Sequence, residues 1–274
     1  MNKKLIFIIL APLLIILLIF FALKFKKAGI AVQSKEGKTV LVSVSRLYNQ
    51  ARELESKGNL PEAKALYQQL VLNFPNSPEV ASWQKKCDEL NIKLLFSPTP
   101  TPKSTIYEIK PGDTLTKIAR QFKTTVELIK KSNNISDDKI LPGRKLKVWT
   151  APFSIVVDKS QNILILKSDE EIIKTYVVST GTNNSTPIGT FKIVNKLTNP
   201  TWFKAGAVVP PDSQENVLGT RWLGFDLSGY GIHGTTDPQS LGKQVTQGCV
   251  RMANPDVEEL YAVVPEGTEV VIVD

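Results

Sequence analysis

The pattern of hydrophobic and polar positions divides the chain into a leading apolar run and three patterned segments. Leu5 to Leu23 is an uncharged apolar run of 19 residues. A helix of that length reaches across about 28 Å, close to the hydrocarbon thickness of a bilayer. A cleaved signal peptide has a shorter apolar core, although Gly29 and Ala31 leave cleavage open. We therefore predict a transmembrane helix that serves as a membrane anchor within residues 1–27.

Residues 40–96 repeat apolar positions at helical spacing. The pattern breaks at residues 58–61, where Pro61 suits a helix start, and again at residues 74–78. This predicts a helical hairpin of the tetratricopeptide type and a third helix from Glu79 to Leu94. A single such unit buries little surface, so a helical spacer or dimerising stalk stays open beside peptide recognition.

Residues 97–104 form a Pro/Thr linker, in which alternating prolines favour an extended, semi-rigid spacer. Residues 105–149 then predict a strand, two helices and a strand. Ile106 to Ile109 alternates as a strand, and Leu115 to Phe122 presents one apolar face. Thr124 to Glu127 is a capping-box pattern that opens the second helix. Lys145 to Val148 is the closing strand.

Residues 151–274 predict a mainly β domain with one clear helix. The expected strands are Phe153 to Asp158, Asn162 to Lys167, Ile172 to Ser179, Thr190 to Asn195 and Glu269 to Val273. Asn254 is the predicted N-cap of the helix, with Pro255 at its first position. The expected fold class is therefore multidomain: a transmembrane helix, an α-helical hairpin, a βααβ module and a mainly β domain.

Composition and charge narrow the function classes. A single His excludes a multi-His metal site, and two Cys cannot form a disulfide framework, so we expect no metal and no cofactor. The net charge of +8 is unevenly spread, being +7 over residues 1–102, +6 over 103–149 and −5 over 150–274. This distribution indicates separate domains with separate partners rather than one nucleic-acid-binding protein.

Two residues of the β domain could carry chemistry. His233 and Cys249 lie 16 residues apart in "YGIHGTT" and "TQGCVRM". Imidazole titrates near neutral pH and can take the proton of a thiol, which is the minimum for nucleophilic acyl transfer. From the spacing alone, a buried structural Cys and a structural His stay open as the alternative.

The βααβ segment resembles a LysM domain through "YEIKPGDTLTKIARQF" and the closing "LPGRKLKV". The resemblance implies binding of glycans that contain N-acetylglucosamine. It also implies a groove between two loops, here Gly112, Asp113, Thr114 and Leu115 on one side and Ile140, Leu141 and Pro142 on the other. Nucleic acid is the alternative partner for a segment of this charge, but interleaved exposed aromatic residues are missing, so we expect no nucleic acid.

Residues 151–274 resemble the L,D-transpeptidase catalytic domain of bacterial cell-wall enzymes. The motifs that carry the resemblance occur in order: "STPIGTF", "NPTWF", "NVLGTRWLGF", "GIHGT" and "GCVRM". The resemblance implies a cysteine nucleophile that cleaves the bond before the terminal D-Ala of a peptidoglycan tetrapeptide stem. The acyl group then passes to a diamino-acid side chain of another stem and forms a 3→3 cross-link.

By the same resemblance, Cys249 is the nucleophile, His233 the general base and Gly234 the residue whose carbonyl holds the imidazole tautomer. Backbone N–H groups of Gly248 and Cys249 are expected to stabilise the oxyanion. Arg251, Thr246 and Gln247 are expected at the substrate, with a structural ion pair as the alternative for Arg251. The family usually has Ser-His-Gly-Cys where this chain has Thr246-Gln247-Gly248-Cys249.

These inferences predict a membrane-anchored L,D-transpeptidase that faces the cell wall, with peptidoglycan stem peptides and glycan strands as partners. Two alternatives stay open. One is an L,D-carboxypeptidase with water as acceptor, and the other is an inactive wall-binding scaffold, which Gln247 suggests because glutamine carries no proton at neutral pH.

Overall fold

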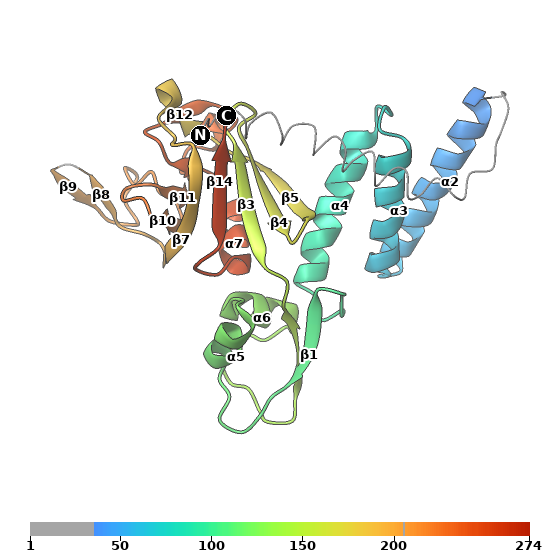
Figure 1. The fold of residues 1–274 in the computed structure, drawn as a ribbon, viewed down its shortest axis with the longest axis horizontal. Coiled ribbons are helices and arrows are strands. Elements are labelled where there is room, and N and C mark those ends of the chain that lie inside the picture. The colour runs from blue at the N-terminus through green and yellow to red at the C-terminus, as the bar shows by residue number, and fades with distance from the viewer. Residues whose placement is uncertain (1–35, 205) are drawn as a thin grey trace, which may run out of the picture. The chain divides into compact units, whose positions relative to one another are not determined.

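The computed structural model describes residues 36–204 and 206–274 (Figure 1). The predicted membrane anchor, residues 1–27, lies outside this range. Within the described part of the chain, no helix is both long enough and apolar enough to cross a membrane. Residues 47–274 form one compact unit, and the contacts discussed below lie within it.

Three helices form the segment predicted to be helical: α2 (Glu36–Ser56), α3 (Leu60–Asn73) and α4 (Val80–Leu95). Pro61 lies in the first turn of α3, where its missing N–H costs nothing. Helices α3 and α4 pack against each other through Ala63, Tyr67 and Leu70 of α3 and the buried face of α4. Cys87 is buried in α4.

The βααβ module is confirmed. Its strands β1 (Ser104–Glu108) and β2 (Lys145–Trp149) pair antiparallel, and helices α5 (Leu115–Phe122) and α6 (Val126–Ser132) lie between them in the chain. A small core holds the module together, with Ile118, Ile129 and Val148 at its centre. One expectation was wrong by a residue: Thr125, and not Thr124, caps α6, because its Oγ1 accepts the Leu128 N–H at 2.9 Å.

The C-terminal domain is built on an eight-stranded sheet in the order β13-β11-β10-β7-β14-β3-β4-β5. Apolar residues on alternating positions bury one face of these strands against helix α7 (Asn254–Val263) and a core centred on Ile155, Leu164 and Val270. The strands are β3 (Phe153–Asp158), β4 (Ile163–Ser168), β5 (Glu171–Val177), β7 (Gly189–Thr198), β10 (Arg221–Phe225), β11 (Gly231–His233), β13 (Val250–Arg251) and β14 (Glu269–Val273).

Short strands outside this sheet shape the loops around its β13 end. Strands β6 (Thr180–Gly181) and β12 (Gln244–Thr246) pair parallel, and β8 (Trp202–Lys204) and β9 (Ala207–Val209) form a hairpin. All five predicted strands of this domain are confirmed within a few residues at their ends. The predicted N-cap is wrong: Ala253 precedes α7, and Asn254 uses its side chain elsewhere.

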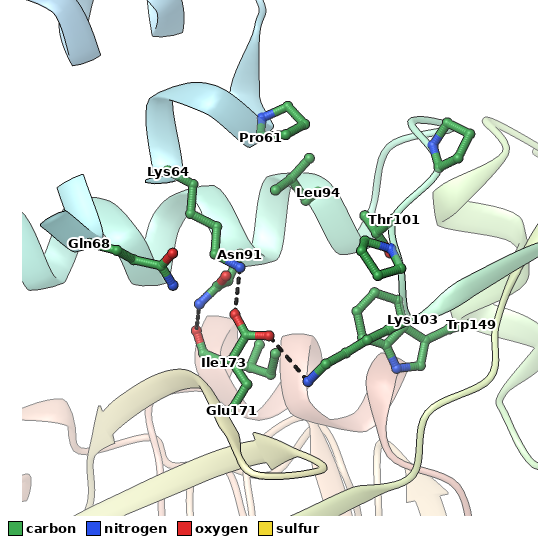
Figure 2. A pocket seen from close by; sticks show the side chains of 12 residues that line it. Pro61, Lys64, Gln68, Asn91, Leu94, Thr101, Lys103, Trp149, Glu171 and Ile173 are labelled. Carbon is green, nitrogen blue, oxygen red and sulfur yellow. Dashed lines mark hydrogen bonds and ion pairs between the residues drawn. The ribbon is translucent and has the colours of Figure 1, made fainter. Parts of the chain in front are cut away.

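Helix α4 covers the β5 edge of the sheet. The Asn91 side chain donates to the Ile172 and Ile173 carbonyls at 3.2 and 2.8 Å, and Asp88 Oδ2 accepts the Thr175 N–H at 3.1 Å. Backbone groups that an exposed edge strand would present to water are therefore bound by side chains of the helical segment. Figure 2 shows Asn91 reaching Ile173 beside a cavity of about 250 Å³.

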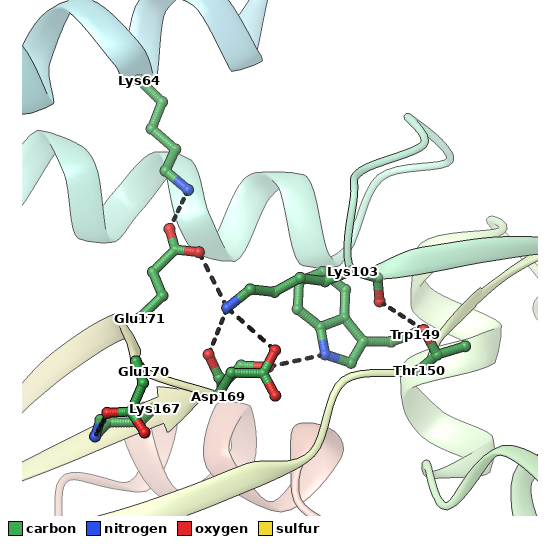
Figure 3. A network of polar contacts seen from close by, with 9 residues as sticks. Lys64, Lys103, Trp149, Thr150, Lys167, Asp169, Glu170 and Glu171 are labelled. Carbon is green, nitrogen blue, oxygen red and sulfur yellow. Dashed lines mark hydrogen bonds and ion pairs between the residues drawn. The ribbon is translucent and has the colours of Figure 1, made fainter.

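The Pro/Thr linker does not stand free of the domains, contrary to the expected spacer. Ser104 N donates to Thr101 O at 3.0 Å and closes a turn, after which Lys103 Nζ lies 3.1 Å from Glu171 and bonds the Ser168 carbonyl. Glu171 also pairs with Lys64 of α3 at 2.5 Å. Figure 3 shows this network, in which Lys103 reaches strand β5. The linker is thus packed against the two segments that it joins.

Candidate active site

His233 ends strand β11 and is held by its neighbour in sequence. Its Nδ1 lies 2.6 Å from the Gly234 carbonyl oxygen. A carbonyl oxygen can only accept, so Nδ1 carries the hydrogen and Nε2 keeps its lone pair. This is the tautomer that a general base needs, and the contact agrees with the role expected for Gly234.

The imidazole is 3% exposed. Burial disfavours the charged ring and lowers the pKa of His233 to about 4, with the Arg251 charge acting in the same direction and the Gly234 hydrogen bond against it. The Trp222 indole stacks on the ring with centroids 6.1 Å apart. His233 is therefore a neutral acceptor of protons at neutral pH.

Strand pairing places the segment that carries the nucleophile candidate beside the strand of this base. Strands β11 and β13 run parallel, and His233 lies opposite Arg251, two residues after Cys249. The turn before Cys249 is closed by Thr246 Oγ1, which donates to the Cys249 carbonyl at 2.6 Å. Gly248 takes φ +132°, and a Cβ there would lie 2.7 Å from the Tyr230 ring, so only glycine fits.

The Cys249 thiol is partly exposed and bonds the Gly229 carbonyl at 3.5 Å. Burial raises the pKa of Cys249, while the Gly231 N–H and the Arg251 charge act against that rise. With the pKa of the thiol raised and the pKa of the imidazole lowered, the pair rests as neutral thiol and neutral imidazole.

The remaining predicted substrate residues fall into two groups. Gln247 is exposed beside Cys249, where a substrate could meet it, whereas Thr246 is 5% exposed and serves the turn. Arg251 is half-buried, and its Nη1 donates to Ser240 Oγ at 3.0 Å while its backbone pairs with Ser179. Thr246 and Arg251 therefore support the backbone around Cys249 through hydrogen bonds within the protein.

One expectation for the oxyanion differs from the structure. The Gly248 N–H, expected to face the substrate, donates to Thr246 Oγ1 at 3.2 Å. Among the described residues, no group of three or more His, Cys, Asp or Glu side chains is arranged to hold a metal ion.

Comparisons with known proteins agree with the motifs. The model of the L,D-transpeptidase catalytic domain, called YkuD, matches residues 152–272. YkuD of Bacillus licheniformis, whose name places it with the L,D-transpeptidases, is 35% identical over 175 residues that cover 61% of this chain and 98% of that protein. The chain belongs to the L,D-transpeptidase family.

A second curated relative and a solved structure also resemble this L,D-transpeptidase family member. YqjB of Bacillus subtilis, also named as an L,D-transpeptidase, is 40% identical over 44% of this chain and 70% of its own length. A solved structure of the catalytic domain from Enterococcus faecium L,D-transpeptidase is 22% identical and covers 45% of this chain and 98% of that one, with a TM-score of 0.38. The family supports an enzyme of the acyltransferase type.

The L,D-transpeptidase family member also contains a LysM domain, whose model matches residues 107–149. Cell wall-binding protein YocH of Bacillus subtilis is 40% identical over 28% of this chain and 28% of its own length. The two predicted glycan loops lie together, because the backbone of Ile109 pairs with Gly143 and Arg144. At the loop tips, Gly112, Pro142 and Leu141 are exposed, and Leu141 is 64% exposed.

The other predicted glycan residues have structural partners in the LysM domain. Asp113 Oδ2 accepts the Tyr107 hydroxyl at 2.8 Å, and Thr114 caps α5. The Leu115 side chain is buried in the module's core, so only its backbone can meet a ligand. Ile140 is half-buried against the same core.

Sequence reasoning missed three residues that shape the active site. Trp222 stacks on His233, Tyr230 packs over Gly248, and Asn254 binds the peptide after Gly234. Trp222 lies in a motif that carried the family resemblance and Tyr230 directly precedes another, and those positions were the available signal. Asn254 was visible only as a helix-start residue, because its partners lie 19 and 34 residues away.

Proposed function

We propose that this protein is a peptidoglycan L,D-transpeptidase that forms 3→3 cross-links through an acyl-enzyme on Cys249. The observation that supports the proposal most is the hydrogen bond of His233 Nδ1 to Gly234 O, which leaves a neutral Nε2 acceptor beside the strand that follows Cys249. The family assignment supplies the reaction class.

In the acylation step, the donor stem docks at the partly exposed thiol, which turns from the Gly229 carbonyl toward Nε2. His233 takes the Sγ proton, and the thiolate attacks the carbonyl carbon before the terminal D-Ala. The tetrahedral oxyanion is stabilised by the Cys249 N–H, joined by Gly248 if substrate displaces its bond to Thr246. Collapse breaks the C–N bond, and the imidazolium protonates the amine of the departing D-Ala.

In the transfer step, a side-chain amine of the diamino acid in another stem attacks the thioester. Neutral His233 accepts the proton lost by that amine and returns it to the sulfur as the amide forms. Gln247, exposed beside the thiol, contributes a neutral hydrogen bond to the bound stem.

We further propose that residues 1–27 anchor the protein in the cell membrane with Val32 and all later residues outside the cytoplasm. The support is the uncharged run from Leu5 to Leu23 and the location of cross-linked wall, the proposed substrate. The LysM domain holds the enzyme on glycan strands. Protease added to intact protoplasts should digest the soluble part, whereas complete protection would reverse this topology.

The decisive experiment incubates the purified protein with a defined disaccharide-tetrapeptide and identifies the products by mass spectrometry. Cross-linked dimer with release of D-Ala is expected, and it should vanish in Cys249→Ala. Release of D-Ala without dimer would instead identify a carboxypeptidase. Labelling of Cys249 by a carbapenem, which acylates cysteines of this family, tests the nucleophile separately.

The exposed Gln247 calls for its own comparison. If the Cys249–His233 pair is complete, Gln247→His should change kcat/KM only modestly, and His233→Ala should be nearly as damaging as Cys249→Ala because members of one catalytic unit are not additive. Inert wild type together with turnover in Gln247→His would make the natural protein a scaffold.

A further inference from the structure

The side chain of Asn254 bonds the chain at the ends of two paired strands, β10 and β11, of which β11 carries His233. Its Oδ1 accepts the Thr235 N–H at 3.0 Å and the Thr220 N–H at 3.2 Å. Thr235 follows the end of strand β11, and Thr220 precedes strand β10, whose Trp222 stacks on the imidazole. One side-chain oxygen thus binds the backbone after strand β11 and the backbone before strand β10.

The Thr235 contact bears directly on the tautomer. The Thr235 N–H and the Gly234 C=O belong to the same planar peptide group, and in a trans peptide they point in opposite directions. Asn254 binds the N–H end of this group, and His233 Nδ1 donates to its C=O end. Fixing one end therefore fixes the direction of the other, and the continuous hydrogen-bond chain polarises the carbonyl toward the imidazole.

Two glycines make room for this oxygen. A Cβ on Gly234 or on Gly219 would lie 2.2 Å from Asn254 Oδ1, well inside van der Waals contact. Gly219 also takes φ +62°, which favours glycine on its own account. At both positions any residue larger than glycine would clash with Asn254 Oδ1, so the two glycines and Asn254 fit one another.

We propose that Asn254 is a positioning residue for the proposed acyl transfer: it holds the Gly234 peptide so that His233 keeps its hydrogen on Nδ1 and its lone pair on Nε2. The inference rests on the proposed function for its catalytic consequence. The effect on the imidazole itself is independent of turnover. Asn254 acts only through Gly234 and Thr220 and touches no reacting atom.

The chain's single histidine makes this testable without ambiguity. In the full-length protein labelled with ¹⁵N-histidine, long-range ¹H–¹⁵N spectra report one imidazole, its tautomer and its titration. Wild type should show the Nδ1–H tautomer. Asn254→Ala should give a mixture of tautomers and lower kcat/KM on the muropeptide donor about tenfold, the worth of one hydrogen bond.

Asn91→Ala is the matched control, because the Asn91 side-chain amide likewise bonds two backbone groups but lies at the opposite, β5 edge of the sheet. It should leave the His233 spectrum unchanged. An unchanged tautomer in Asn254→Ala would overturn the proposal. A changed tautomer in a protein whose wild type has no turnover would support the positioning role while the proposed function fails.

Asn254→Asp keeps the proposal falsifiable if Asn254→Ala does not fold. A carboxylate retains the acceptor, so the Nδ1–H tautomer should persist, and its negative charge should raise the pKa of His233 relative to wild type. Loss of the Nδ1–H tautomer in Asn254→Asp, in which the acceptor oxygen is retained, would contradict the proposal.

Discussion

At the scale of single residues, the burial of His233 couples the active site to the stability of the fold. The ring is 3% exposed, and burial lowers its pKa from 6.5 to about 4. The unfolded chain therefore binds a proton over a pH range in which the folded protein does not. Stability from this group is present above pH 6.5 and is lost as the pH falls toward 4.

Because its pKa is lowered in the folded protein, His233 should make the fold less stable at acidic pH. Lowering the pH from 7 to 5 should reduce the unfolding free energy by about 2 kcal/mol through this group. Urea denaturation at the two pH values measures the change in wild type and in His233→Gln, whose side chain does not titrate. The variant should lose about 2 kcal/mol less than wild type over this interval. Equal losses in the two proteins would show that the imidazole is not buried as described.

The two cysteines differ in the property that decides reactivity. Cys87 is 3% exposed, and burial raises its pKa to about 12, whereas Cys249 is partly exposed and lies near the positive charge of Arg251. The thiolate is the reactive form, so native protein should take up one iodoacetamide per chain, at Cys249. Peptide mass spectrometry locates the label. Cys87→Ala should label like wild type, and labelling that persists in Cys249→Ala would contradict this.

The sequence could point to candidate reacting residues but not to the groups that orient them. One Cys and one His in the domain, set in family motifs, were enough to select Cys249 and His233. Asn254 was interpreted as a helix cap because local pattern says nothing of a backbone N–H 34 residues away. The Gly248 N–H was expected at the oxyanion from the family resemblance, and its bond to Thr246 could not be read from the sequence.

At the scale of elements, the strands were predictable because alternation of apolar residues follows directly from the two faces of a sheet. The predicted and observed bounds of β3 and β14 are the same. What the helical segment does was not predictable. Its partner is strand β5 of the same chain, reached through Asn91, Asp88 and Lys64, and polar side chains at such a junction look like ordinary solvent-facing residues in the sequence.

The contact between helix α4 and strand β5 should contribute to the stability of the fold. Asn91→Ala removes the donor of the Ile172 and Ile173 carbonyls. Leaving such groups unsatisfied should lower the unfolding free energy by about 1–3 kcal/mol. Urea denaturation of Asn91→Ala against the exposed control Asn76→Ala measures it. Turnover at saturating substrate should be unchanged, because β5 and β13 are opposite edges of the sheet. If Asn91→Ala lowers the unfolding free energy no more than Asn76→Ala does, the contacts of α4 do not stabilise the β5 edge.

At the scale of residues 47–274, the LysM domain is packed against the helical segment and the C-terminal domain. Lys147 Nζ donates to the Leu94 and Ser97 carbonyls at the end of α4, at 2.5 and 2.8 Å. Trp149 stacks on Phe153, and Leu128 belongs to the same core as the catalytic sheet. The orientation of the glycan loops toward the catalytic domain is therefore set by buried contacts.

This packing decides how glycan binding should be tested. Deleting residues 106–149 would uncover the core that Leu128 and Trp149 complete, so a loss of binding would be confounded with a loss of folding. A substitution at an exposed loop tip avoids this. Leu141 is 64% exposed in the predicted glycan groove, and Leu72 on helix α3 is 72% exposed outside it. The two leucines are a matched pair.

Leu141→Glu should weaken co-sedimentation with purified peptidoglycan, because it removes an apolar contact and places a charge where an uncharged sugar is expected. Leu72→Glu makes the same chemical change and should pellet like wild type. Both variants should keep the wild-type kcat/KM on a small soluble muropeptide, since neither residue lies near Cys249. Equal pelleting of the two variants would mean that the loop at Leu141 does not bind glycan. Loss of turnover in Leu141→Glu alone would mean instead that the LysM loops act on the active site directly.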